Sequence, residues 1–175
     1  PESLEFVTRR AADAPVNIHH MASLTKGREG REMVEIGFLT DLGAVAFTDG
    51  VRVVQDTRLL NRCMTYARGL DALIVGHPQD AGLSKGAAAT SGKFASIYGI
   101  PAVSPMAEVM GVSRDLALVQ MTRCRWHADQ ITTAGALPAL TRARDAGLDV
   151  TAGISIHHLT LNEFDVGDYR TFFRF

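Results

Sequence analysis

The sequence predicts an α/β fold built on a parallel sheet, either a barrel or a doubly wound sheet. Apolar runs of strand length alternate with helical patterns along most of the 175 residues. These runs are apolar on both faces, which is typical of parallel strands covered by helices. The histidines fall where such runs give way to loops, and they are His19, His20, His77, His127, His157 and His158. Loops at the carboxyl edge of a parallel sheet build active sites, so the pattern also predicts where chemistry occurs.

Five helices are predicted from apolar side chains at helical spacing, over residues 3–12, 28–42, 58–69, 106–121 and 134–146. The fourth has the most regular pattern, through Val109, Val112 and Leu116. Gly43 and Gly147 stand just after the second and fifth helices, where a glycine cap is common.

Five strands are predicted, each after a helix, over residues 15–20, 43–48, 72–76, 125–130 and 149–156. A closed eight-stranded barrel takes about 250 residues, so five units predict the middle of a larger barrel. We therefore interpret residues 1–175 as a single segment of one barrel domain. Five aromatic residues also crowd the last twelve positions, a composition that normally continues into structure that buries it: Phe164, Tyr169, Phe172, Phe173 and Phe175.

The interval from residue 78 to residue 105 interrupts the alternation. It is rich in Gly, Ala and Ser and shows no helical face of useful length. Loops longer than about 12–15 residues are uncommon in compact domains and are usually functional or disordered. Because the interval follows the strand that ends at His77, we interpret it as a mobile lid, with simple disorder as the alternative.

Composition excludes several classes of function. The chain has 18 basic and 19 acidic residues and no basic stripe, so no nucleic-acid partner is expected. No stretch approaches the roughly 18 apolar residues of a membrane span, and the first residues lack the apolar core of a signal peptide. The two cysteines, Cys63 and Cys124, are interpreted as reduced and structural, which predicts a cytoplasmic protein.

Polar residues at three predicted strand ends are candidates for chemistry. Asp49 in FTDG is either a turn residue or a metal ligand or general base, and His77 is either a surface residue or a ligand. Asp, His and His on neighbouring strand ends would suit zinc. The third such end carries His127 and Gln130, and a neutral amide is a poor substitute for imidazole. His157 and His158 are interpreted as capping and packing residues rather than substrate ligands, and the interpretation of His19 and His20 is similar.

Several ordered segments resemble the dihydroorotases of the amidohydrolase superfamily over essentially the whole chain. The segments are LTKG, GAVAFTD, IPAVSPMAE, RDLAL, TTAG and HHLTLNE. The resemblance implies a partial (β/α)8 barrel of the TIM type that holds roughly strands three to seven. It also implies a zinc-dependent cyclic amidohydrolase of pyrimidine biosynthesis, which interconverts N-carbamoyl-aspartate and dihydroorotate. The family's HxHxR motif, its substrate-binding asparagine and its catalytic aspartate belong to elements that this sequence does not contain.

The same resemblance assigns metal positions and shows where this sequence departs from them. Asp49 matches the metal-bridging aspartate, with FTDG in place of FSDDG, and His77 matches a metal histidine, with HPQD in place of HAED. Gln130 occupies the position of the sixth-strand metal histidine, because HADQITTAG stands where the family has HVAHVSTAG, and His127 matches the first histidine there. The lid motif MNEG reads ATSG at residues 89–92. The resemblance thus implies zinc in a partial or vestigial site and assigns no catalytic or substrate-binding residue here.

Loss of one histidine from a binuclear site should weaken metal binding severely, so impaired hydrolysis is expected. The first hypothesis is an active zinc amidohydrolase. The second is a non-catalytic, dihydroorotase-like scaffold that assembles with aspartate transcarbamoylase, as some relatives do. A generic α/β binding domain is the third hypothesis, and it applies if the resemblance misleads. We also expect a homo-oligomer.

Overall fold

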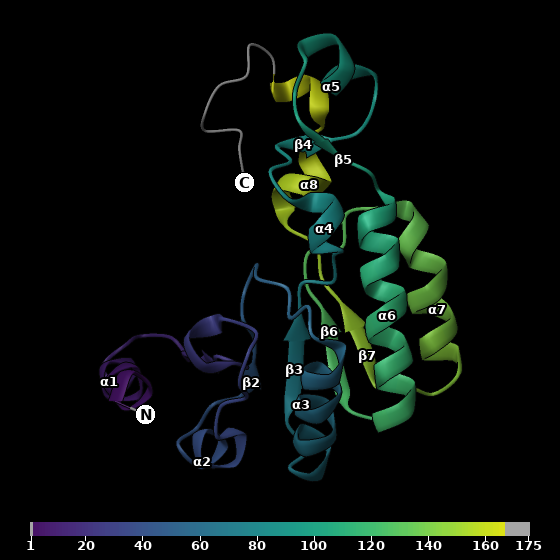
Figure 1. Cartoon of the computed structure of the whole chain (residues 1–175). Coiled ribbons are helices and arrows are strands. Elements are labelled where there is room, and N and C mark those ends of the chain that lie inside the picture. Colours follow the sequence, from purple (N-terminus) through teal and green to yellow (C-terminus); the bar gives the residue numbers. More distant parts are fainter. Residues whose placement is uncertain (1, 167–175) are drawn as a thin grey trace.

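The computed structural model describes residues 2–166, and its centre is a five-stranded parallel sheet (Figure 1). The strands lie in the order β1 (Met21–Ala22), β2 (Ala46–Phe47), β3 (Leu73–Gly76), β6 (Arg125–Ala128) and β7 (Val150–Ala152). This order follows the chain without the reversal that marks a doubly wound sheet. The α/β prediction is therefore confirmed, and the strand order is that of a barrel segment.

Three long helices cover one face of this sheet (Figure 1). They are α3 (Thr57–Gly69), α6 (Met106–Thr122) and α7 (Leu137–Asp145), and α6 contacts both of its neighbours. Helix α3 begins at Asp56, whose carboxylate accepts hydrogen bonds from the Arg58 and Leu59 amides at 2.8 and 3.1 Å. Such a cap satisfies amides that have no partner within the helix. The remaining helices near the amino end are α1 (Glu2–Ala11) and α2 (Ile36–Asp41).

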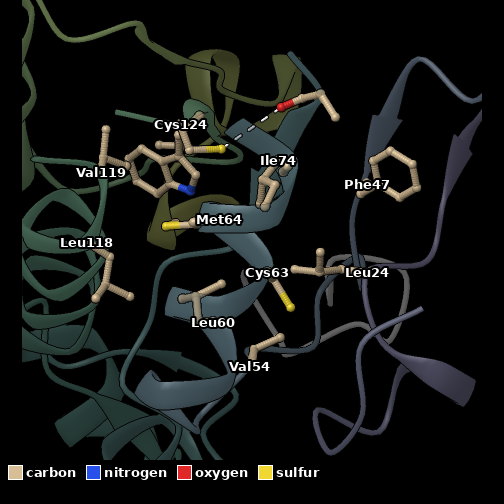
Figure 2. Close-up of a cluster of buried hydrophobic side chains, with 14 of the residues drawn as sticks. Leu24, Phe47, Val54, Leu60, Cys63, Met64, Ile74, Leu118, Val119 and Cys124 are labelled. Carbon is tan, nitrogen blue, oxygen red and sulfur yellow. Dashed lines mark hydrogen bonds between the residues drawn. The ribbon is translucent and has the colours of Figure 1, made fainter. Parts of the chain in front are cut away.

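The core lies between the sheet and these helices (Figure 2). Trp126 and Ile74 on the strands face Met64 and Val119 on the helices, and all four side chains are almost fully buried. Burial of each such side chain stabilises the fold by about 1.5–3 kcal/mol. The prediction that Cys63 and Cys124 are structural is confirmed, because both are free and completely buried.

Both thiols should resist modification in the native protein. Burial raises the pKa of Cys63 to about 11 and that of Cys124 to about 12, and only the thiolate reacts readily. We expect no reaction with a disulfide reagent at mildly alkaline pH until a denaturant is added. Counting modified thiols by absorbance with and without urea tests this, and rapid labelling without urea would contradict the burial of the two side chains.

The structure corrects two predicted elements near the amino end. Residues 15–20 are not a strand, and Val16 and Ile18 are exposed, because the edge strand β1 takes its register from β2 at Ala46 and Phe47 instead. The helix predicted over residues 28–42 is reduced to Ile36–Asp41. Gly27 and Gly30 have positive φ and break the helical path, and the chain makes only the 3-10 turn Lys26–Arg28 there.

The placement of the histidines is also corrected. Only His77 directly follows a strand of the main sheet. His19 and His20 precede β1, and His127 lies within β6. His157 and His158 belong to helix α8 (Ile156–Thr160), whose N-terminal cap is Ser155 rather than a histidine. The predicted strands begin too early or extend too far compared with the strands of the structure. The prediction that all six histidines lie at one edge of the sheet is therefore wrong.

The interval 78–105 contains regular structure that the sequence did not predict. It holds α4 (Ala81–Ser84), β4 (Ala89–Thr90), α5 (Lys93–Tyr98) and β5 (Ala102–Val103), and β4 pairs with β5 in parallel. Phe94 is buried there against Tyr98 and Phe164, with ring centroids 4.6 and 6.3 Å away. Figure 1 shows these elements with α8 and the 3-10 turn Glu163–Val166, beyond the carboxyl ends of the main strands. The lid motion remains a prediction. Of the aromatic tail, Phe164 is exposed, and Tyr169, Phe172, Phe173 and Phe175 lie outside the described residues.

Candidate functional site

Asp49 follows β2 and links the ends of the first two strands. Its side chain is only 4% exposed. Oδ1 accepts hydrogen bonds from the Leu24 and Thr25 amides, each at 3.0 Å, and Oδ2 accepts one from the Thr25 hydroxyl at 2.5 Å. A carboxylate offers about four lone-pair directions, so three donors leave one, on Oδ2. Asp49 can therefore form at most one further bond, and its existing contacts clamp the loop after β1.

His77 lies beside Asp49 at the same edge of the sheet. It comes directly after β3 and is half-buried. Its Nδ1 atom is buried without a hydrogen-bond partner. Asp49 and His77 line the same cavity of about 20 Å³. The structure thus brings together two of the three positions that the sequence singled out.

Gln130 lies in the loop after β6 and does not line this cavity. Its backbone has φ +54°, a conformation uncommon for residues other than glycine. Hydrogen bonds of 2.8 Å on both sides hold the loop, from the Asp129 amide to Gly76 O and from the Ile131 amide to Gly153 O. The Gln130 backbone is therefore fixed by the ends of β3 and β7 rather than free to move.

His127 is a packing residue in the described structure. Its Nδ1 lies 2.7 Å from the Thr151 hydroxyl on β7. A Cβ atom at Gly153 would lie only 3.0 Å from its Nε2, so the imidazole depends on that glycine for room. His127 therefore packs against the neighbouring strand rather than joining Asp49 and His77.

The zinc hypothesis needs three or four protein ligands around one ion. Within residues 2–166, no three His, Cys, Asp or Glu side chains are grouped so that they could hold a metal. Asp49 and His77 supply two donors at most, and Gln130 supplies a neutral amide. The described residues alone do not fit a zinc centre.

Glu108 holds the loop after β6 in place, and the sequence analysis did not single it out. It lies in the first turn of α6 and is 9% exposed. Its carboxylate accepts hydrogen bonds of 2.6 to 3.2 Å from the amides and hydroxyls of Thr132 and Thr133. The TTAG segment, residues 132–135, precedes α7, and its two threonines donate to Glu108. The sequence feature that could have identified Glu108 is a glutamate on a helix face whose other residues are largely buried.

Comparison with known proteins identifies the family. The family model described as Dihydro-orotase-like matches residues 1–135. A dihydroorotase-like protein of Pseudomonas putida is 34% identical over 170 residues, which is 97% of this chain and 40% of that protein. A dihydroorotase of Geobacillus thermodenitrificans is 35% identical over 166 residues, 94% of this chain and 39% of the relative. The chain thus spans about two fifths of the length of these curated relatives.

Solved structures with the same fold have distant sequences. L-hydantoinase (dihydropyrimidinase) from Arthrobacter aurescens superposes with a TM-score of 0.68 at 17% identity, over 93% of this chain and 38% of that one. A D-hydantoinase gives a TM-score of 0.67 at 16% identity, over 93% and 37%. In the described part, no helix is long and apolar enough to cross a bilayer. The partial amidohydrolase barrel is confirmed, and the chain belongs to the dihydroorotase-like family.

Proposed function

We propose that this chain is the central part of a dihydroorotase-like protein whose metal site is degenerate. The reaction is the hydrolysis of a cyclic amide and its reverse, the closure of the ring. The two substrates are dihydroorotate and N-carbamoyl-aspartate. This protein catalyses their interconversion poorly. The observation that carries the proposal is Gln130, an amide in a fixed backbone position where the family resemblance places a metal histidine. We place the protein in the cytoplasm, with zinc as the cofactor of a fully liganded site.

Two features of the described residues support this proposal. Asp49 has three of its four acceptor directions taken by Leu24 and Thr25, so it offers little to a metal. His77 offers one imidazole. Metal-assisted hydrolysis needs an ion that polarises the amide and activates water. A site with one free imidazole, one engaged carboxylate and one neutral amide holds such an ion weakly.

Gln130→His in the full-length protein should raise zinc occupancy. The restored imidazole can bind the metal, and the backbone that carries it is already fixed. Metal content is measured by elemental analysis after dialysis against a defined zinc concentration. Gln120→His places the same substitution at an exposed position of α6 and controls for adventitious binding. Equal zinc content in the two variants would show that Gln130 does not occupy a ligand position.

A non-catalytic scaffold is the second candidate. Large apolar side chains are exposed beyond the carboxyl ends of the strands, namely Ile97, Leu159 and Phe164, and such surfaces mark protein interfaces. The partner to test is aspartate transcarbamoylase, together with self-association into a homo-oligomer. Sedimentation of the purified full-length protein, alone and mixed with purified aspartate transcarbamoylase, separates the candidates. A complex that contains both proteins would support the scaffold function. Sedimentation of the two proteins as separate species would favour the impaired hydrolase.

A further inference from the structure

Thr25, in the loop after β1, is a polar residue whose side chain is completely buried. It is 0% exposed and lies against Asp49. Burial of a hydroxyl costs free energy unless the hydroxyl is hydrogen-bonded. The partners of the Thr25 hydroxyl therefore indicate what this loop holds in place.

Thr25 holds both oxygens of the Asp49 carboxylate. Its backbone amide donates to Oδ1 at 3.0 Å, and its hydroxyl donates to Oδ2 at 2.5 Å. The torsion that turns an aspartate carboxylate about its Cβ–Cγ bond is broad, so the side chain alone does not fix the plane of the group. Two donors from one residue, one on each oxygen, fix that plane. The orientation of the Asp49 carboxylate is therefore set by Thr25.

The Thr25 hydroxyl is itself held in one orientation. It accepts a hydrogen bond of 2.9 Å from the backbone amide of Gly30. Gly30 has φ +66°, a left-handed conformation that favours glycine, and the chain turns back toward Thr25 there. A hydroxyl has one proton to donate, and an ionised carboxylate can only accept. Because the Gly30 amide occupies the oxygen of the hydroxyl, the hydroxyl proton points at Asp49.

We propose that Thr25 is a positioning residue of the candidate site, and that its hydroxyl fixes the direction in which Asp49 can form its one further bond. Among the described residues, only this hydroxyl donates to Oδ2, so the remaining acceptor direction of Asp49 lies on that oxygen. The role in orienting the carboxylate rests on the described contacts alone. Its consequence for metal binding rests on the proposed function and deepens it.

The expected size of the effect follows from the role of such partners in other proteins. Residues that orient a metal ligand by hydrogen bonding typically change metal affinity by about 10–100-fold when they are replaced. In the wild-type protein this effect is obscured, because Gln130 supplies only a neutral amide. The Gln130→His variant adds an imidazole and makes the contribution of Thr25 measurable.

The first test uses crystals of the full-length protein without added metal. The wild-type structure should show Thr25 Oγ1 within hydrogen-bond distance of Asp49 Oδ2. Thr25→Val removes the hydroxyl and keeps a branched side chain, so the Asp49 carboxylate should turn or occupy two orientations. Thr25→Ser keeps the hydroxyl and should retain the wild-type orientation. A wild-type structure without the contact, or an unchanged carboxylate in Thr25→Val, would overturn the proposal.

The second test separates positioning from folding, with zinc alone as the probe. In the full-length Gln130→His protein, Thr25→Val should weaken zinc binding by about 10–100-fold, and Thr25→Ser should weaken it much less. Thr122→Val is the matched control. The Thr122 hydroxyl also donates to one oxygen, Leu118 O at 2.8 Å, and accepts from one backbone amide, Cys124 N at 3.3 Å, but it lies before the amino end of β6.

Thr122→Val should leave zinc affinity unchanged. Equal zinc affinities in the Thr25→Val and Thr122→Val proteins would show that Thr25 acts only through stability, which would overturn the positioning role. If Gln130→His itself does not raise zinc binding, the proposed ligand position is wrong. The orientation of the Asp49 carboxylate in the crystals then still decides the role of Thr25, so the two failures are distinguishable.

Discussion

Gly111→Ala is expected to destabilise the protein more than any other single-methyl change in α6. A Cβ at this position would lie 2.4 Å from the Gln79 nitrogen and 2.5 Å from the Pro78 carbonyl carbon. These are backbone atoms, which cannot turn aside as a flexible side chain can. Overpacking typically costs about 1–3 kcal/mol, and a clash with backbone belongs at or above the upper end. We expect a loss of about 3 kcal/mol or more in urea unfolding.

Gly69→Ala at the end of α3 is the matched control. Apart from its chain neighbours and the backbone of its own helix, no heavy atom lies within 4 Å of a Cβ there. Alanine in place of a helical glycine stabilises by roughly 0.5–1 kcal/mol where space allows. Similar unfolding midpoints for the two variants would contradict the close contact between α6 and residues 78–79. Because those residues directly follow His77, the same contact fixes the position of the candidate ligand.

Glu108→Ala should produce the second large effect. The carboxylate is the acceptor for four donors on Thr132 and Thr133, and alanine leaves them without it. One unsatisfied buried donor costs about 1–3 kcal/mol, and these groups are part-buried, so we expect a total of about 3 kcal/mol. The loss should appear locally as well, as faster hydrogen exchange of the Thr132 and Thr133 amides.

Glu5→Ala on the exposed face of α1 is the control for loss of a glutamate. It should leave both stability and amide exchange near the wild-type values. If Glu108→Ala left the exchange of the two threonine amides unchanged, the conclusion that Glu108 holds the loop after β6 would be wrong. Gln130 lies two residues before Thr132, so zinc binding by the Gln130→His variant should also fall when Glu108 is replaced.

The spacing of apolar residues correctly predicted the helices and strands that have packing neighbours on both sides. The elements α3, β3, α6 and β6 match their predicted ranges closely, because buried helices and strands carry regular apolar spacing. The same reasoning failed for residues 15–20 and 28–42. There the register is set by pairing with β2, and turns at Gly27 and Gly30 interrupt a helical pattern. Neither constraint is visible in hydrophobic spacing.

The candidate site was predictable in part for a similar reason. Parallel strands end at one edge of a sheet, so Asp49 and His77 could be placed together, and they share one cavity. The carboxylate of Glu108 was not identified, because a helical pattern does not show which distant loop a buried polar residue meets. Glu108 contacts residues 24 and 25 positions away along the chain. The hydrogen bonds that occupy Asp49 were likewise hidden from sequence reasoning.

The most direct test of a degenerate metal site is the zinc content of the full-length wild-type protein, measured together with dihydroorotate hydrolysis. After dialysis against zinc that saturates an active dihydroorotase, we predict well under one equivalent of zinc per chain and little turnover. Zinc bound in stoichiometric amount, with rapid hydrolysis of dihydroorotate, would contradict the account and show that Gln130 is tolerated or that another ligand replaces it.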